Sequence, residues 1–110
     1  MPNKRKKRVF GTSEKPRLVV YRSLRYMHAQ LIDDNDGRVI LGLSDKSKAI
    51  GTALKDAKTK TEKSHALGKF FAEEAKKKDV AKIIFDRNGY IYHGRVKAFA
   101  EGAREGGLDF

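Results

Sequence analysis

The sequence predicts an α/β fold: a single domain in which helices pack on a mixed sheet, preceded by a flexible basic N-terminal arm. Three observations support this prediction. Runs of β-forming residues follow one another in the N-terminal half, apolar stripes at helical spacing lie in the C-terminal half, and an unbroken apolar run separates the stripes. The resulting order of elements is βββαβα. A chain of 110 residues can bury one hydrophobic core but not two.

The N-terminal segment, residues 1–16, is expected to be the flexible arm. It contains the basic cluster Lys4–Arg8 and little apolar content before Pro16. With Lys15 and Arg17, the first seventeen residues hold seven of the 25 basic groups. The folded domain is then expected to span residues 17–110.

Three short segments are expected to form a meander of strands. Arg17–Ser23 is rich in β-formers, and Tyr26–Ile32 alternates between apolar and polar side chains. The two residues between these runs predict a hairpin. Asp36-Gly37 is a two-residue turn signal, so Arg38–Ser44 is expected to be the third strand.

The first helix is expected after a polar segment, residues 45–61, which reads as a loop or a marginal helix. Thr59 and Glu62 have the spacing of a capping box. Beyond them lies an apolar stripe typical of a helix on a sheet, formed by Leu67, Phe70, Phe71 and Ala75. The lysines that follow are expected to be a solvated helix end near its negative dipole pole.

A fourth strand and a second helix complete the predicted domain. Val80–Asp86 contains an unbroken apolar run, which is typical of a strand buried on both faces and reached by a helical crossover. A second helix is indicated by the stripe of Val96, Phe99, Ala100 and Ala103, with Gly106-Gly107 ending it.

Composition and charge narrow the class of function. Lys and Arg outnumber Asp and Glu by 25 to 14, a formal net charge of +11, and clustering in the arm favours nucleic acid as the partner. The absence of cysteine excludes disulfides, thiolate zinc sites and thiol catalysis, and it suits a reducing cytoplasm. No secretory signal or membrane-spanning apolar run is expected.

Residues 86–96, DRNGYIYHGRV, lie between a predicted strand and a predicted helix, as a nucleotide-binding P-loop does. Gly89 and Gly94 have the P-loop spacing, and a helix N-terminus suits phosphate. Two departures argue against nucleotide chemistry: Val96 stands where a hydroxyl would hold Mg²⁺, and Arg95 stands where the P-loop has Lys. The sequence therefore favours a phosphate-binding turn for a larger anion.

The other groups of this loop suit RNA, because cations hold phosphate and rings stack on unpaired bases. Tyr90 and Tyr92 have a structural alternative of equal weight, with their rings packed on the sheet. His93 either holds the loop as a donor at the helix entrance or contacts a phosphate or 2′-hydroxyl. Backbone freedom is enough to explain Gly94. Arg95 is the strongest single candidate for direct RNA contact.

Spacing does not support a metal site or an acid–base pair. If Gly37 were the sixth residue of a calcium loop, Ile32 and Leu43 would fall at ligand positions. The three histidines lie on different predicted elements. Asp86 and His93 could form an acid–base pair, but nothing in their spacing demands it. We expect no enzyme activity, no metal and no cofactor.

Several stretches resemble one protein family. They are KPRLVVYRS, AQLIDDNDGR, HALGKFFAEEAKKK and IIFDRNGYIYHGRVKAFAEGAREGGLDF. Together, from about residue 15 to residue 110, they resemble the bacterial large-subunit ribosomal protein family L18, which binds 5S rRNA. The resemblance implies a mixed α/β fold and a cytoplasmic, non-catalytic ribonucleoprotein role in translation. In that role the protein seats 5S rRNA in the central protuberance, beside 23S rRNA and other 5S-binding proteins.

The resemblance also implies where RNA is contacted: on the arm, the first hairpin and the YHGR loop. Carried over to this chain, the RNA-binding residues are Lys4, Arg5, Lys6, Lys7, Arg8, Arg17, Arg22, Ser23, Arg25, Tyr26, Arg87, Tyr90, Tyr92, His93, Gly94 and Arg95. Two alternatives remain open at this point. One is an enzyme or NTP-binding module built on the strand–loop–helix, and the other is a nonspecific basic chaperone or DNA-binding protein.

Overall fold

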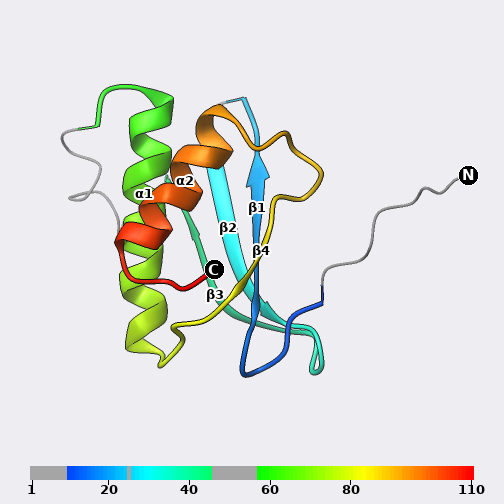
Figure 1. Cartoon of the computed structure of the whole chain (residues 1–110). Helices are drawn as coiled ribbons and strands as arrows, with labels where there is room; N and C mark the ends of the chain where they lie inside the picture. Colours follow the sequence, from blue (N-terminus) through cyan, green and yellow to red (C-terminus); the bar gives the residue numbers. More distant parts are fainter. Residues whose placement is uncertain (1–9, 25, 46–56) are drawn as a thin grey trace, which may run out of the picture.

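Three strands, a helix, a fourth strand and a second helix follow one another along the chain, which confirms the predicted order βββαβα. The computed structural model describes residues 10–24, 26–45 and 57–110. Figure 1 labels the elements, which are β1 (Arg17–Arg22), β2 (Met27–Asp33), β3 (Arg38–Ser44), α1 (Lys60–Lys77), β4 (Ile84–Asp86) and α2 (Gly94–Glu105).

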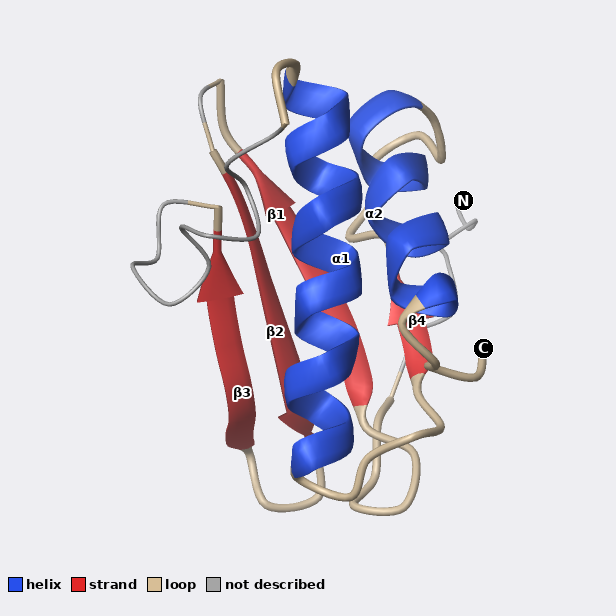
Figure 2. Ribbon diagram, turned by 90° about the vertical axis from the view of Figure 1, so that its left-hand side faces the viewer, coloured by secondary structure: helices blue, strands red, loops and turns tan. Residues whose placement is uncertain are grey.

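The four strands form one mixed sheet in the order β3-β2-β1-β4 (Figure 2). The pairs β1–β2 and β2–β3 are antiparallel, whereas β1 and β4 are parallel, with Leu18 opposite Phe85. Parallel strands have their carboxyl ends at the same edge of a sheet. The turn that follows β1 and the loop that follows β4 therefore leave the sheet side by side.

Both helices cover the same face of the sheet (Figure 2). The side chains of β2 alternate along the strand, and the buried positions include Met27, Ala29 and Leu31, as the sequence predicts. Leu18 and Val20 of β1 are also fully buried in this core. Alternation with a period of two places these five side chains under the helices.

The two helices pack closely against each other at a pair of glycines. Gly68 of α1 lies against the backbone oxygen of Phe99, and Gly102 of α2 lies against that of His65. The rings of Phe71 and Phe99 meet edge to face, with their centroids 6.0 Å apart. The predicted apolar stripes are confirmed: Leu67, Phe71 and Ala75 of α1 and Val96, Phe99, Ala100 and Ala103 of α2 are fully buried, and Phe70 is partly buried.

The fourth strand differs from its prediction. It spans only Ile84–Asp86, and all three residues are half-buried, so the prediction of a strand buried on both faces over Val80–Asp86 is wrong. The physical reason is that β4 lies at the edge of the described sheet, where it pairs with β1 on one side. Residues before it run instead beside the C-terminus, where the backbone N–H of Ile83 donates to the carbonyl of Asp109.

The turn between β2 and β3 is longer than the two-residue turn that Asp36-Gly37 suggested. Asp33 pairs with Arg38, so four residues connect the strands, and Gly37 takes the positive φ of 64°. A register shift at Leu31/Ile32 accompanies this turn.

Two predictions fall partly outside the described residues. Residues 1–9 of the predicted arm and residues 46–56 of the predicted loop over 45–61 are not described, and neither is Arg25. Within the described remainder, Gly11 is buried and exchanges hydrogen bonds with Asp34. Thr59 caps α1, as predicted: its Oγ1 accepts from the backbone N–H of Glu62 at 3.1 Å.

Candidate nucleic-acid interface

The turn after β1 and the loop after β4 meet in space and form one surface at the upper end of the sheet in Figure 1. Hydrogen bonds made by Tyr90 and Arg95 join them. The hydroxyl of Tyr90 accepts from the backbone N–H of Arg22 at 2.9 Å, and Nη1 of Arg95 donates to the carbonyl of Ser23 at 2.9 Å. Residues about 70 positions apart in the chain are thus neighbours. The structure brings together most of the predicted site residues of the hairpin and the YHGR loop.

The turn after β1 is held by Ser23. Its backbone N–H donates to the carbonyl of Tyr26 at 2.9 Å, and its Oγ accepts from the N–H of Tyr26 at 3.0 Å. The side chain of Leu24, at the tip, is 83% exposed. Arg25, also predicted to bind RNA, lies outside the described residues. The backbone polar groups of Ser23 are thus used within the protein, which leaves exposed side chains to contact a ligand.

The loop after β4 begins with a tight turn. Asn88 and Gly89 both have positive φ, 56° and 79°, as the central residues of a type I′ turn do. The backbone N–H of Tyr90 donates to the carbonyl of Arg87 at 3.0 Å, and Nη1 of Arg87 donates back to the carbonyl of Tyr90 at 2.6 Å. This turn directs the Arg87 side chain along the loop.

The entrance of α2 explains Gly94 and weakens the nucleotide interpretation. Gly94 has φ of 57°, a conformation that a glycine adopts without strain. His93 is the N-cap residue, but its side chain makes no capping hydrogen bond, and its N–H donates to the carbonyl of Ile91 at 2.8 Å. A P-loop leaves its amides open for phosphates, whereas the amides of Tyr90 and His93 are used inside this loop.

Arg95 points into the protein, toward the hairpin turn. Besides the bond to Ser23, its Nε and Nη2 atoms are buried, and no described residue accepts a hydrogen bond from them. In the unbound protein, the guanidinium of Arg95 therefore joins the two segments of the surface. Among the residues that the structure describes here, Arg22 at the end of β1 and Arg87 and His93 of the loop are exposed to solvent.

Arg17 lies at the opposite end of β1 from Arg22, about 17 Å away for five steps along a strand. Its guanidinium bonds Asp34 through Nε and Nη2 and Asp86 through Nη1, at 2.9 to 3.1 Å. The hydrogen bonds with Asp34, reinforced by Asp86, raise the pKa of Arg17 above its ordinary value. The structure therefore does not bring this predicted residue to the loop surface. Asp86 is committed to Arg17 and to the N–H of Asn88, so it forms no acid–base pair with His93.

The aromatic residues of the surface differ in exposure. Tyr26 and Tyr92 are 40% and 39% exposed. The ring of Tyr92 meets Phe85 edge to face at 6.4 Å, and its hydroxyl accepts from Nη1 of Arg104 at 3.4 Å. Tyr90 packs against the core. Of the two alternatives for the loop tyrosines, the structure favours the packed one for Tyr90.

One further cation reaches this surface. Lys60, the first residue of α1, donates from Nζ to the carbonyl of Leu24 at 2.5 Å. Sequence reasoning missed this contact, because nothing in the local pattern connects the start of a helix with a turn 36 residues earlier. The capping box of Thr59 and Glu62 predicts that Lys60 lies in the first turn of α1, but it does not predict which residue Lys60 contacts.

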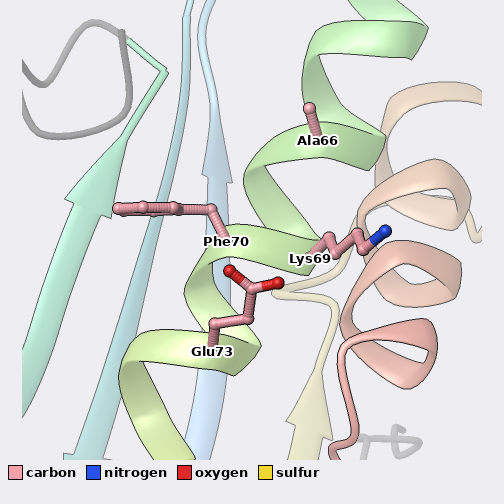
Figure 3. A pocket seen from close by; sticks show the side chains of 4 residues that line it. All are labelled: Ala66, Lys69, Phe70 and Glu73. Atoms are coloured by element: carbon pink, nitrogen blue, oxygen red, sulfur yellow. The ribbon is translucent and has the colours of Figure 1, made fainter. Parts of the chain in front are cut away.

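Other kinds of site find little support. Among the described residues there is no group of three potential metal ligands, and no helix is long and apolar enough to cross a membrane. A depression of about 220 Å³ lies on α1, where the four described lining residues, Ala66, Lys69, Phe70 and Glu73, belong to that one helix (Figure 3). Phe70 extends toward the sheet and Lys69 toward α2, so the two do not converge on a common ligand.

Comparison with known proteins gives the chain's family. The model of ribosomal L18 of archaea, bacteria, mitochondria and chloroplast matches residues 3–110. The chain is 49% identical over 105 residues to the large ribosomal subunit protein uL18 of Caldicellulosiruptor saccharolyticus, covering 96% of this chain and 84% of the relative. It is 51% identical over 102 residues to the protein of the same name from Chloroherpeton thalassium, covering 93% and 83%. These matches confirm the resemblance seen in the sequence, and the chain belongs to the ribosomal L18 family.

Proposed function

We propose that this protein binds 5S rRNA and helps to attach it to 23S rRNA in the central protuberance of the large ribosomal subunit, together with other 5S-binding proteins. Membership of a ribosomal protein family already confirms the expectation that the chain is not an enzyme. The named relatives are proteins of the large ribosomal subunit, which supports the same location for this one.

The observation that carries the proposal is the meeting of the β1–β2 turn and the β4–α2 loop. Arg22 and Arg87 lie there as exposed cations, and no ion pair within the described residues neutralises either of them. Tyr26 follows the turn and is 40% exposed, and Tyr92 of the loop is 39% exposed, with its ring against Phe85. Guanidinium groups beside rings suit an RNA with both phosphates and unpaired bases.

The proposed contacts fall into two groups. Arg22, Arg87 and His93 would hold phosphates or sugars, and Tyr26 and Tyr92 would stack on bases. The proposal also includes the other residues that the resemblance implies. At the loop surface, supporting roles fall to Ser23, Tyr90, Gly94 and Arg95. A contact away from that surface is proposed for Arg17, and contacts outside the described residues are proposed for Lys4, Arg5, Lys6, Lys7, Arg8 and Arg25.

A competition gel shift tests the proposal. Labelled 5S rRNA with Mg²⁺ at near-physiological salt would be challenged with excess tRNA and, separately, with excess duplex DNA. We expect the 5S complex to survive both competitors. Equal displacement by either one would favour the alternative of a basic protein without selectivity, because charge alone binds any polyanion.

Two cation substitutions locate the contact. Arg22→Ala and Arg87→Ala should each weaken 5S binding by about 1–3 kcal/mol and lower the slope of log affinity against log salt by about 0.7–0.9, the value for one lost phosphate contact. Arg38→Ala is the matched control, because Arg38 is an exposed arginine at the start of β3, at the other end of the sheet. Effects of the same size in all three variants would argue against a localised site.

The arm is tested separately by deleting residues 1–8, which removes five cations. Because every neutralised phosphate releases counterions, the truncated protein should have a flatter salt dependence. An unchanged slope would show that the arm does not contact RNA.

Calorimetry with ATP and GTP tests the alternative of a nucleotide-binding module. Binding of either nucleotide that is abolished by Gly94→Val would support that alternative.

A further inference from the structure

We propose that Tyr90 is a positioning residue that holds Arg22 and Arg87 in place for RNA, and that its own ring and hydroxyl do not contact RNA. This inference rests on the proposed function and deepens it. It divides the predicted loop residues into those that touch the ligand and one that arranges them.

The hydroxyl of Tyr90 is already used on the hairpin. It accepts from the backbone N–H of Arg22 at 2.9 Å and lies 3.4 Å from the carbonyl of the same residue, to which it can donate. A phenolic hydroxyl has one proton to donate. The hydroxyl is thus bonded to the last residue of β1, where the strand turns away from the sheet.

The ring of Tyr90 is used as well. The guanidinium carbon of Arg22 lies 4.8 Å from the ring centroid, a cation–π distance. The same side chain packs against the hydrophobic core, which includes the nearby sheet residues. With a cation over the ring and the core against it, the ring is not placed as an open platform for a base, whereas Tyr92 is 39% exposed.

The backbone of Tyr90 holds the second cation. Its carbonyl accepts from Nη1 of Arg87 at 2.6 Å, and its N–H donates to the carbonyl of Arg87 at 3.0 Å. One residue therefore contacts both exposed arginines, each by a different group. The bond from Arg95 to Ser23 joins the same two segments a second time and limits how far they can separate.

This arrangement lowers the entropic cost of binding. Long arginine side chains lose rotamer freedom when they grip a phosphate. Where the ring and carbonyl of Tyr90 already restrict Arg22 and Arg87, less freedom is lost on contact with RNA. The distance between the two cations is also set in advance, so the pair can select for phosphates at a matching spacing.

The test is Tyr90→Phe, which removes one oxygen and no charge. We expect 5S affinity to fall about three- to tenfold, the equivalent of one hydrogen bond, with an unchanged salt slope. In the free protein, the Arg22 amide should exchange faster with solvent. The control for affinity and thermal stability is Tyr21→Phe. It removes a hydroxyl from β1, the strand of Arg22, at a residue that is not among the proposed RNA contacts.

A double-mutant cycle separates positioning from direct contact. If the hydroxyl acts through Arg22, adding Tyr90→Phe to Arg22→Ala should cost less than half of what it costs alone. With Arg87→Ala the two losses should add, because Arg87 is held by the backbone of Tyr90 and not by its hydroxyl. Full additivity with Arg22→Ala would instead show that the hydroxyl touches RNA.

The outcomes distinguish this inference from the function on which it rests. If the wild-type protein retains 5S rRNA against both competitors and the cycle with Arg22 is additive, the positioning role is overturned and the function stands. If the wild-type protein shows no preference for 5S rRNA, the proposed function is overturned, and the role of Tyr90 in RNA binding is overturned with it.

Discussion

Arg17 and Asp34 form a two-pronged ion pair across the start of β1. Nε of Arg17 lies 2.9 Å from Oδ2 of Asp34, and Nη2 lies 3.1 Å from Oδ1. Oδ2 also accepts from the backbone N–H of Gly11 at 2.7 Å, and Asp86 takes the remaining side of the guanidinium. One carboxylate thus joins the segment before β1 to the turn after β2, and Arg17 links both to β4.

Asp34→Ala should destabilise the protein by about 1–3 kcal/mol, because it leaves Gly11 without its acceptor and Arg17 with one carboxylate. The side chains of Arg17 and Asp34 are only 20% and 19% exposed, so water replaces the lost bonds poorly. Urea denaturation measures the change. Asp36→Ala, at an exposed position in the same turn, is the control. Equal effects of the two substitutions would contradict a special role for the ion pair.

Gly68→Ala should destabilise the contact between α1 and α2. A Cβ atom at this position would lie 2.1 Å from the backbone oxygen of Phe99, so the helices would have to separate. Overpacking costs about 1–3 kcal/mol, and this outweighs the gain of about 1 kcal/mol in helix propensity when backbone must move. Thermal melting measures the result.

The control for this substitution is Gly42→Ala on β3, where the nearest atom to a new Cβ is 3.8 Å away and no clash arises. Its melting temperature should stay close to that of the wild type. A Gly68→Ala protein that melts at or above the wild-type temperature would show that the two helices adjust at little cost.

Thr59→Ala should cost about 1 kcal/mol, the usual loss for an N-cap whose side chain accepts a hydrogen bond. The Oγ1 of Thr59 accepts from the N–H of Glu62, and Oε1 of Glu62 accepts from the N–H of Lys58 at 2.7 Å. Thr59→Ser keeps the acceptor and should retain most of the stability in urea. A serine variant as unstable as the alanine variant would assign the loss to the methyl group instead.

Glu105 should titrate below the ordinary range of a glutamate. The hydrogen bond from Nε2 of His65, at 3.0 Å, is the main cause of the lowered pKa of Glu105, and the charge of Lys69 adds a smaller effect. A carboxyl with a lowered pKa stabilises the folded state above its ordinary pKa, and this contribution is lost as the pH falls through the lowered value. The stabilisation from this exposed pair, which is small, should therefore be lost in acid.

An NMR titration of the Glu105 carboxyl carbon measures this directly. We expect His65→Ala to raise the midpoint toward the ordinary glutamate value, and Lys69→Ala to raise it less. The reverse order of the two variants would assign the lowered pKa of Glu105 to the lysine.

The order of elements and the core were predictable because they depend on short-range patterns. Alternation in β2 and the stripe of Leu67, Phe71 and Ala75 each follow from the geometry of a single element. The fourth strand was overestimated because an apolar run does not reveal where a strand stops pairing. The length of β4 depends on its pairing with β1, whose partner residues lie 67 positions earlier in the sequence.

The candidate site was predictable as a set of segments and not as a set of roles. Both the hairpin and the YHGR loop could be identified from their residues. That Arg95 faces Ser23, and that Arg17 is held by two carboxylates, depends on contacts between residues far apart in the chain. A sequence shows which residues carry charge, but it does not show which charges are used inside the protein.

The parallel pairing of β1 with β4 sets a time as well as a place for the surface that we propose binds RNA. The ribosome makes the hairpin of β1 and β2 early, but its partner loop emerges only after α1 and β4 have been made. A nascent chain that ends before Tyr90 has Arg22 without the groups that hold it. Assembly of the complete surface therefore waits for the last quarter of the polypeptide, so an unfinished chain cannot present Arg22 and Arg87 together in their final geometry.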